Sequence, residues 1–145
     1  MHKQDPYNLN RFVEAQASNF ADALAELRAG CKETHWSWYV FPQIRGLGSS
    51  PASVRYAISS KAEASAYLEH AVLGPRLREC VKAMNAHRGV SASQILGDID
   101  SRKYCSCLTL FAQAAPTETI FSDALKKYFG GVPDAATLAI LARGP

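Results

Sequence analysis

The chain has 145 residues, 48% of them hydrophobic, which is enough to bury the core of one compact domain and excludes a disordered chain. Its 16 Lys and Arg and 13 Asp and Glu are interleaved and give a net charge of +3, so we do not expect a dedicated nucleic-acid binder. No window approaches the ~18 consecutive apolar residues of a membrane span, and the start does not resemble a signal peptide. These observations predict a cytoplasmic protein with reduced cysteines and no membrane partner.

The first third of the chain carries repeated helix signals. Asp5 and Pro6 have the order of a helix cap and a first helical residue. Apolar residues then recur on one helical face as far as Gly30, a residue typical of helix ends. Ser18 and Asn19 prefer caps to helix interiors, so this stretch is expected to divide into two helices.

The next third contains the only β-prone segments. Residues 35–43 read HWSWYVFPQ and residues 54–58 read VRYAI, with the polar loop GLGSSPAS between them. Their aromatic and β-branched composition favours extended backbone. We therefore expect at most one short β-hairpin or extended segment around residues 36–58.

The remainder of the chain again predicts helices. Ser60 and Glu63 have the spacing of a capping box, and Asp98 or Asp100 is placed to cap a helix that ends before Pro116. Further helices are expected over residues 75–88, 120–129 and 134–141. Residues 1–145 are thus predicted to form a single compact all-α domain of about six to eight helices.

Several motifs point to a known family. They are D-P-Y-N-L-x-R-F near the start, H-W-S-W-Y-V-F-P-Q-I-x-G-L-G-x-S, and I-L-G-D-I-D-x-x-K. This combination resembles a small, mostly bacterial family of unknown function whose members are often labelled "calpastatin". The resemblance covers essentially the whole chain, except that Ser37 replaces a larger apolar residue, and it implies no activity. Calpain inhibitors of that type are long disordered chains with repeats, which this sequence does not resemble.

The aromatic segment has two compatible interpretations. Aromatic clusters most often form a core, and this one is expected to be mainly core. Alternatively, Trp36 or Trp38 forms a stacking platform, worth ~1–3 kcal/mol per base, while His35 and Gln43 supply hydrogen bonds. Of the segment, His35 and Gln43 are the residues expected to face a ligand.

A second group of polar residues lies at the start of a predicted helix. Asp100, Lys103 and Ser106 share one helical face, so a carboxylate, an ammonium and a hydroxyl converge near a helix N-terminus. The structural alternative is a helix cap and an exposed salt bridge. His35 and Asp100 are the candidate catalytic proton carriers. Lys32, Arg45 and Lys103 are the candidate contacts for negative charge.

Two functional hypotheses follow. In the first, the protein binds a nucleotide-like or other anionic aromatic small molecule, and whether it also hydrolyses that molecule is left open. In the second, it is a non-catalytic interaction module, including one that self-associates as a homodimer. No cofactor is expected. No metal site is expected either, because Cys105 and Cys107 point ~200° apart on a helix and no Cys/His pair has zinc spacing.

Overall fold

The computed structural model describes residues 5–143, which form ten helices and no strand. The helices are α1 (Asn10–Gln16), α2 (Phe20–Ala29), α3 (Ser37–Val40), α4 (Pro51–Arg55), α5 (Lys61–Glu69), α6 (Leu73–Asn85), α7 (Ala92–Leu96), α8 (Asp98–Ala114), α9 (Thr119–Phe129) and α10 (Ala135–Ala142). The predicted all-α fold is confirmed. The count exceeds the expected one because α3, α4 and α7 have only four or five residues, too few to leave a periodic pattern. None of the described helices is long and apolar enough to cross a membrane.

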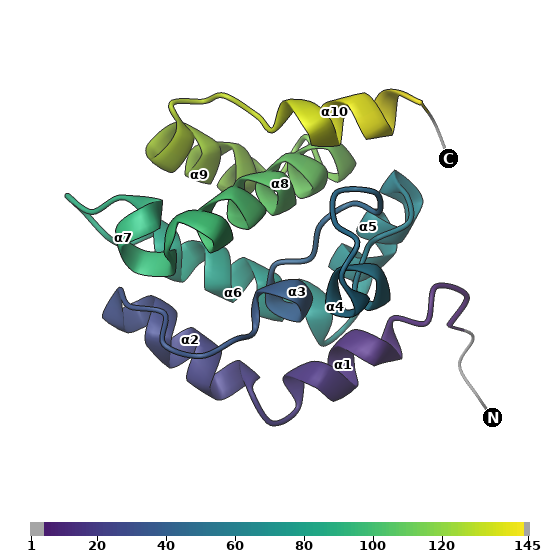
Figure 1. The fold of residues 1–145 in the computed structure, drawn as a ribbon, viewed down its shortest axis with the longest axis horizontal. Coiled ribbons are helices and arrows are strands. Elements are labelled where there is room, and N and C mark those ends of the chain that lie inside the picture. Colours follow the sequence, from purple (N-terminus) through teal and green to yellow (C-terminus); the bar gives the residue numbers. More distant parts are fainter. Residues whose placement is uncertain (1–4, 144–145) are drawn as a thin grey trace.

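Helix α8 lies at the centre of the molecule (Figure 1). It contacts α3, α5, α7, α9 and α10, while α6 packs against α2, α5 and α9. Tyr104, Leu108 and Phe111 of α8 are fully buried, and so are residues on other faces of the same helix. A helix that is apolar on most sides must be covered on most sides, which explains why the other helices surround α8.

The helix boundaries follow most of the sequence signals. The chain breaks between α1 and α2 at Ser18 and Asn19, and α2 ends at Gly30 in the left-handed conformation (φ 80°). The Ser60 hydroxyl accepts a hydrogen bond from the Glu63 N–H at the start of α5, as a cap does. The predicted cap of α8 by Asp98 or Asp100 is wrong: Gly97 occupies the cap position, and both aspartates lie in the first turn. Negative charge is favourable there because it faces the positive end of the helix dipole.

Little extended structure forms within residues 36–58. Among the described residues the one β-type pairing is an isolated parallel bridge between Ile44 and Ile58. In it the Ile58 N–H donates to the Gln43 carbonyl at 2.8 Å, and the Arg45 N–H donates to the Ile58 carbonyl at 2.8 Å. The segment is therefore extended only around this bridge, with short helices before and between its two arms.

Candidate ligand-binding site

The aromatic segment divides its side chains between the core and a cavity. Trp36 is 1% exposed, and Phe41 is equally buried, with its ring centroid 4.6 Å from that of Tyr104 on α8. Trp38 and Gln43 are half-buried and line a cavity of about 480 Å³. Both interpretations of the segment thus describe part of it: one tryptophan belongs to the core and the other to a cavity wall.

Glu26 holds Trp36 on the core side. Its carboxylate accepts hydrogen bonds from the Trp36 ring N–H at 2.9 Å, the Thr34 hydroxyl at 2.7 Å, and the backbone N–H groups of Glu33 and Thr34. Burial raises the pKa of the Glu26 carboxyl, but these hydrogen bonds outweigh burial and lower it from 4.5 to about 2. Trp36 is therefore a structural residue, fixed by a buried carboxylate.

Helix α8 forms one wall of the cavity. Its residues Ile99, Arg102, Lys103 and Ser106 line the cavity and follow the i, i+3, i+4, i+7 pattern of a single helical face. The opposite walls come from the α3 segment, the loop after Ile44, and residues near the ends of α4, α9 and α10. The cavity thus lies where the aromatic segment meets the start of α8.

Glycines allow the loop after Ile44 to form part of this lining. Gly46 has φ +105°, a conformation that side chains other than glycine rarely adopt. A Cβ on Gly48 would lie 2.8 Å from the Cβ of Ser53, so this position has no room for a side chain. The loop can therefore approach the cavity closely only with glycine at these two positions.

A chain of charges runs along the cavity edge. Lys32, whose side chain is 6% exposed, places its ammonium 2.8 Å from one Asp100 oxygen. Lys103 lies farther from the other Asp100 oxygen, at 3.5 Å, and its ammonium is 4.2 Å from the centroid of the Trp38 ring. Burial opposes ionisation of Asp100, but its pKa is lowered by the Lys32 hydrogen bond and charge and by Lys103. Lys32 already neutralises Asp100, so the Lys103 charge remains available to the cavity.

Four of the nine predicted site residues line this cavity: Trp38, Gln43, Lys103 and Ser106. The other five lie elsewhere, and Trp36, Lys32 and Asp100 among them are engaged as described above. His35 is exposed and outside the lining, and its carbonyl accepts a hydrogen bond from the Tyr39 hydroxyl at 3.3 Å. Arg45 lines a different, smaller cleft.

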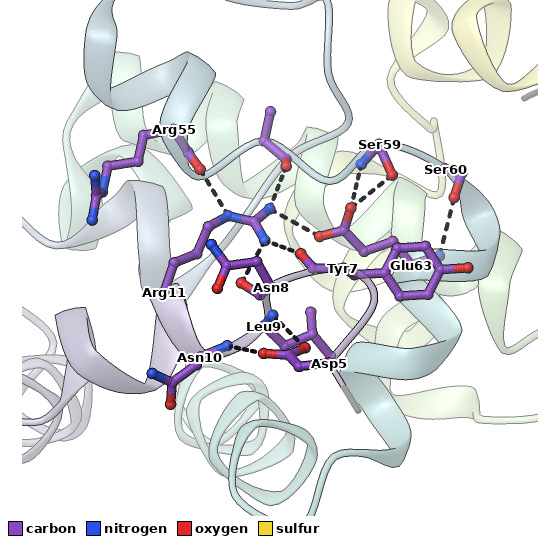
Figure 2. Close-up of polar contacts among 11 residues, drawn as sticks. Asp5, Tyr7, Asn8, Leu9, Asn10, Arg11, Arg55, Ser59, Ser60 and Glu63 are labelled. Carbon is purple, nitrogen blue, oxygen red and sulfur yellow. Dashed lines mark hydrogen bonds and ion pairs between the residues drawn. The ribbon is translucent and has the colours of Figure 1, made fainter. Parts of the chain in front are cut away.

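That second cleft borders a cluster centred on Arg11 (Figure 2). The guanidinium donates to the carbonyls of Tyr7, Asn8, Arg55 and Ala57 and to the Glu63 carboxylate, at distances from 2.6 to 2.9 Å. An arginine has five N–H donors, and here each has a partner. Glu63 is 2% exposed and also accepts from the N–H and hydroxyl of Ser59. Arg11 is therefore committed to the fold and has no donor left for a ligand.

Sequence reasoning missed several cavity residues. Ile99 and Arg102 could have been found, because they share a helical face with Lys103 and Ser106. Tyr56, Phe129 and Asp134 also line the cavity, but they come from separate elements and no local pattern connects them to Trp38. Within residues 5–143 no group of three or more His, Cys, Asp or Glu side chains is placed to hold a metal ion.

Comparison with known proteins places the chain in a family. Residues 6–141 match the family described as "Protein of unknown function (DUF1810)". The chain belongs to this family. A solved structure similar to this DUF1810 member is the crystal structure of the conserved hypothetical protein Rv1873 from Mycobacterium tuberculosis. The two chains are 53% identical with a TM-score of 0.94, and the match covers 95% of this chain and 99% of the other.

The resemblance to a family of unknown function is thus confirmed, whereas the "calpastatin" label and the mostly bacterial distribution are not tested by these matches. No curated protein matches the chain. Neither the description of the DUF1810 family nor that of the similar crystal structure names an activity. The cavity itself is therefore the basis for a proposed function.

Proposed function

We propose that the cavity between the α3 segment and α8 binds a small anionic molecule with an aromatic ring, of nucleotide-like size. The observation that carries the proposal is the pairing of Trp38 with Lys103 in the cavity lining, 4.2 Å from ring centroid to ammonium. An aromatic face and a cation at one point recognise a flat ring and a negative charge in the same molecule.

The size and composition of the cavity support a ligand of this kind. Its volume of about 480 Å³ lies within the ~300–1,000 Å³ typical of small-molecule sites. Trp38, Tyr56 and Phe129 supply aromatic surface, and Ile44 and Leu47 supply aliphatic surface. Such sites combine mostly apolar walls with a few fixed polar groups that orient the ligand.

The charges favour an anion. Arg102 and Lys103 are neighbouring cations in the lining, and Arg102 is exposed to solvent. Asp134 is the one carboxylate in this lining, and it is engaged at the start of α10, where it accepts from the N–H and hydroxyl of Thr137 at 3.0 and 2.6 Å. The cavity therefore presents a net positive charge to a ligand.

The proposal is one of binding rather than hydrolysis. The predicted proton carriers His35 and Asp100 do not line the cavity. Cys105 does, but burial and the Asp134 charge raise the pKa of its thiol, which makes it a weak nucleophile.

Thermal unfolding in the presence of candidate ligands tests the proposal. We would screen AMP, NAD and ADP-ribose, because a ligand at 100 times its Kd stabilises the folded state by ~2.7 kcal/mol. Trp38→Ala and Lys103→Ala should each abolish the shift in melting temperature. Arg88→Ala, which removes an exposed cation outside the cavity lining, should leave it unchanged. Absence of any shift with these ligands, or equal shifts in all variants, would contradict the proposal.

A second candidate function is self-association through the same face. Ile99, a member of the cavity lining, is 67% exposed, and exposed apolar side chains gathered on one face indicate an interaction site. Val54, which follows the lining residue Ser53, is 57% exposed, and Val132, whose carbonyl accepts from the Cys105 thiol, is 66% exposed.

Sedimentation equilibrium distinguishes this candidate from ligand binding. If the face self-associates, the mass should rise with protein concentration, and Ile99→Asp should abolish the rise. Val90→Asp, at a 40% exposed valine in the α6–α7 connection, should not. A monomer at all concentrations would exclude the homodimer.

A further inference from the structure

The Gln43 side chain is an amide of the cavity lining whose hydrogen-bonding capacity is still open. It is half-buried in the lining, and it takes part in no hydrogen bond within residues 5–143. The two serine hydroxyls of the lining have partners within the protein. Ser106 donates to the Arg102 carbonyl at 3.2 Å, and the Ser53 hydroxyl pairs with that of Ser50 at 2.7 Å. A primary amide thus stands without a protein partner on a largely apolar wall.

The backbone that carries this amide is fixed. The Gln43 carbonyl accepts from the Ile58 N–H, and the next residue, Ile44, is 3% exposed and forms the bridge with Ile58. Pro42, immediately before, is buried as well. Two anchored neighbours and a bridging hydrogen bond hold the Cα of Gln43 in place, so that its side chain starts from a defined point on the wall. Positioned polar groups of this kind are what give a pocket its specificity.

The chemistry of an amide restricts what it can recognise in two contacts. Glutamine presents one carbonyl acceptor and one NH₂ donor side by side. It pairs in a bidentate way with a molecule that has a donor and an acceptor on neighbouring positions of one edge, as glutamine does with N6 and N7 of adenine. The lactam edges of other nucleobases have the same neighbouring donor and acceptor.

We propose that Gln43 selects the ring of the ligand, and that this ring is a heterocycle with a hydrogen-bond donor and an acceptor on adjacent positions of one edge. This inference rests on the proposed function and names its ligand class more closely. In this arrangement the ring lies against Trp38, the amide of Gln43 reads the ring edge, and Lys103 and Arg102 meet the anionic substituent. A phenyl ring with the same anionic group would satisfy Trp38 and Lys103 but would leave Gln43 unpaired.

A matched set of monophosphates tests the inference by isothermal titration calorimetry. AMP, IMP and UMP carry adjacent donor and acceptor groups, while purine riboside 5′-monophosphate keeps the purine and the phosphate but lacks the edge donor. We expect at least one of the first three to bind about 10-fold more tightly than purine riboside monophosphate, because only a ring with both edge groups can pair with both groups of the amide. In Gln43→Met, which keeps the side-chain length and removes the amide, this preference should disappear while weak binding of all four persists.

The possible results separate this inference from the proposed function. A preference for the donor–acceptor edge that persists in Gln43→Met, or no preference in the wild type, would overturn the role of Gln43. If binding in those cases still requires Trp38 and Lys103, the proposed function stands. Failure of all four monophosphates to bind the wild-type protein would overturn both. Should Gln43→Met fold poorly, Gln43→Leu, which removes both groups of the amide and adds no charge, provides the same readout.

Discussion

The Arg11 cluster and the α3–α8 cavity are both polar regions, but they use their polar groups in opposite ways. Every donor of Arg11 has a protein partner, and four of these five partners are backbone carbonyls, a pattern that fastens segments together (Figure 2). In the cavity, the Gln43 side chain has no protein hydrogen bond within residues 5–143, and the ion pair of Lys103 is a long contact to an aspartate that Lys32 already neutralises. The first region is built for stability, and the second has capacity left for a ligand.

The comparison also separates two motifs that look alike in the sequence. The motif D-P-Y-N-L-x-R-F contains Asp5, which accepts from the N–H groups of Leu9 and Asn10, and Arg11, which ties this segment to residues 55–63. Its polar residues are explained by the fold. The aromatic motif, by contrast, places Trp38 and Gln43, both half-buried, on a cavity wall. A motif with many polar and aromatic residues therefore does not by itself tell whether those residues stabilise the fold or line a cavity.

Removal of Arg11 should have the largest effect on stability. Arg11→Ala leaves Glu63, 2% exposed, without its cation and the carbonyls of Tyr7, Arg55 and Ala57 without a donor, so we expect a loss of about 3–5 kcal/mol. Arg55→Ala is the matched control: only its backbone carbonyl accepts from Arg11, so the loss should stay below about 1 kcal/mol. Urea denaturation measures both. If both variants lost a similar free energy of unfolding, the hydrogen bonds of Arg11 would not be what stabilises this region.

Replacement of the two lysines around Asp100 should lower the free energy of unfolding by unequal amounts. Lys32→Met removes a buried ammonium that lies 2.8 Å from Asp100 and donates to the Thr34 carbonyl at 2.6 Å, and we expect a loss of about 2–3 kcal/mol. Lys103→Met should cost less than about 1 kcal/mol, because it removes one partly exposed cation–π contact and a weak ion pair. Equal destabilisation in thermal melts would show that Lys103 is structural, which would weaken its assignment to a ligand.

The pH dependence of stability tests the role of Glu26. Its pKa is about 2 in the folded protein and near 4.5 when unfolded, so its contribution is complete above pH ~4.5 and is lost as the pH falls toward 2. At pH 6, Glu26→Gln should be about 1–2 kcal/mol less stable than the wild type, and this difference should shrink on acidification. Glu33→Gln removes an exposed carboxylate but keeps the backbone donor to Glu26, so it should preserve the wild-type pH profile. A constant gap between Glu26→Gln and the wild type would contradict the pKa shift.

Much of the helical structure could be predicted from local signals. The break at Ser18 and Asn19, the end of α2 at Gly30 and the cap at Ser60 all depend on residues within one or two helical turns of each other. The short helices α3, α4 and α7 were missed because four or five residues carry too little pattern. The cavity was predicted only in part: Trp38, Gln43, Lys103 and Ser106 line it, whereas His35 and Arg45 do not.

The sequence alone determined the all-α class, most helix boundaries and two of the segments that line the cavity, because helix propensity, capping and periodicity act over about four residues. Only the tertiary structure decided which tryptophan enters the core and which cation stays available. The Trp36 ring N–H is satisfied inside the core because Glu26 accepts from it, and Lys103 stays available to a ligand because Lys32, 68 positions before Asp100, already pairs with that carboxylate. Those outcomes depend on partners brought together by folding, and local patterns carry no information about them.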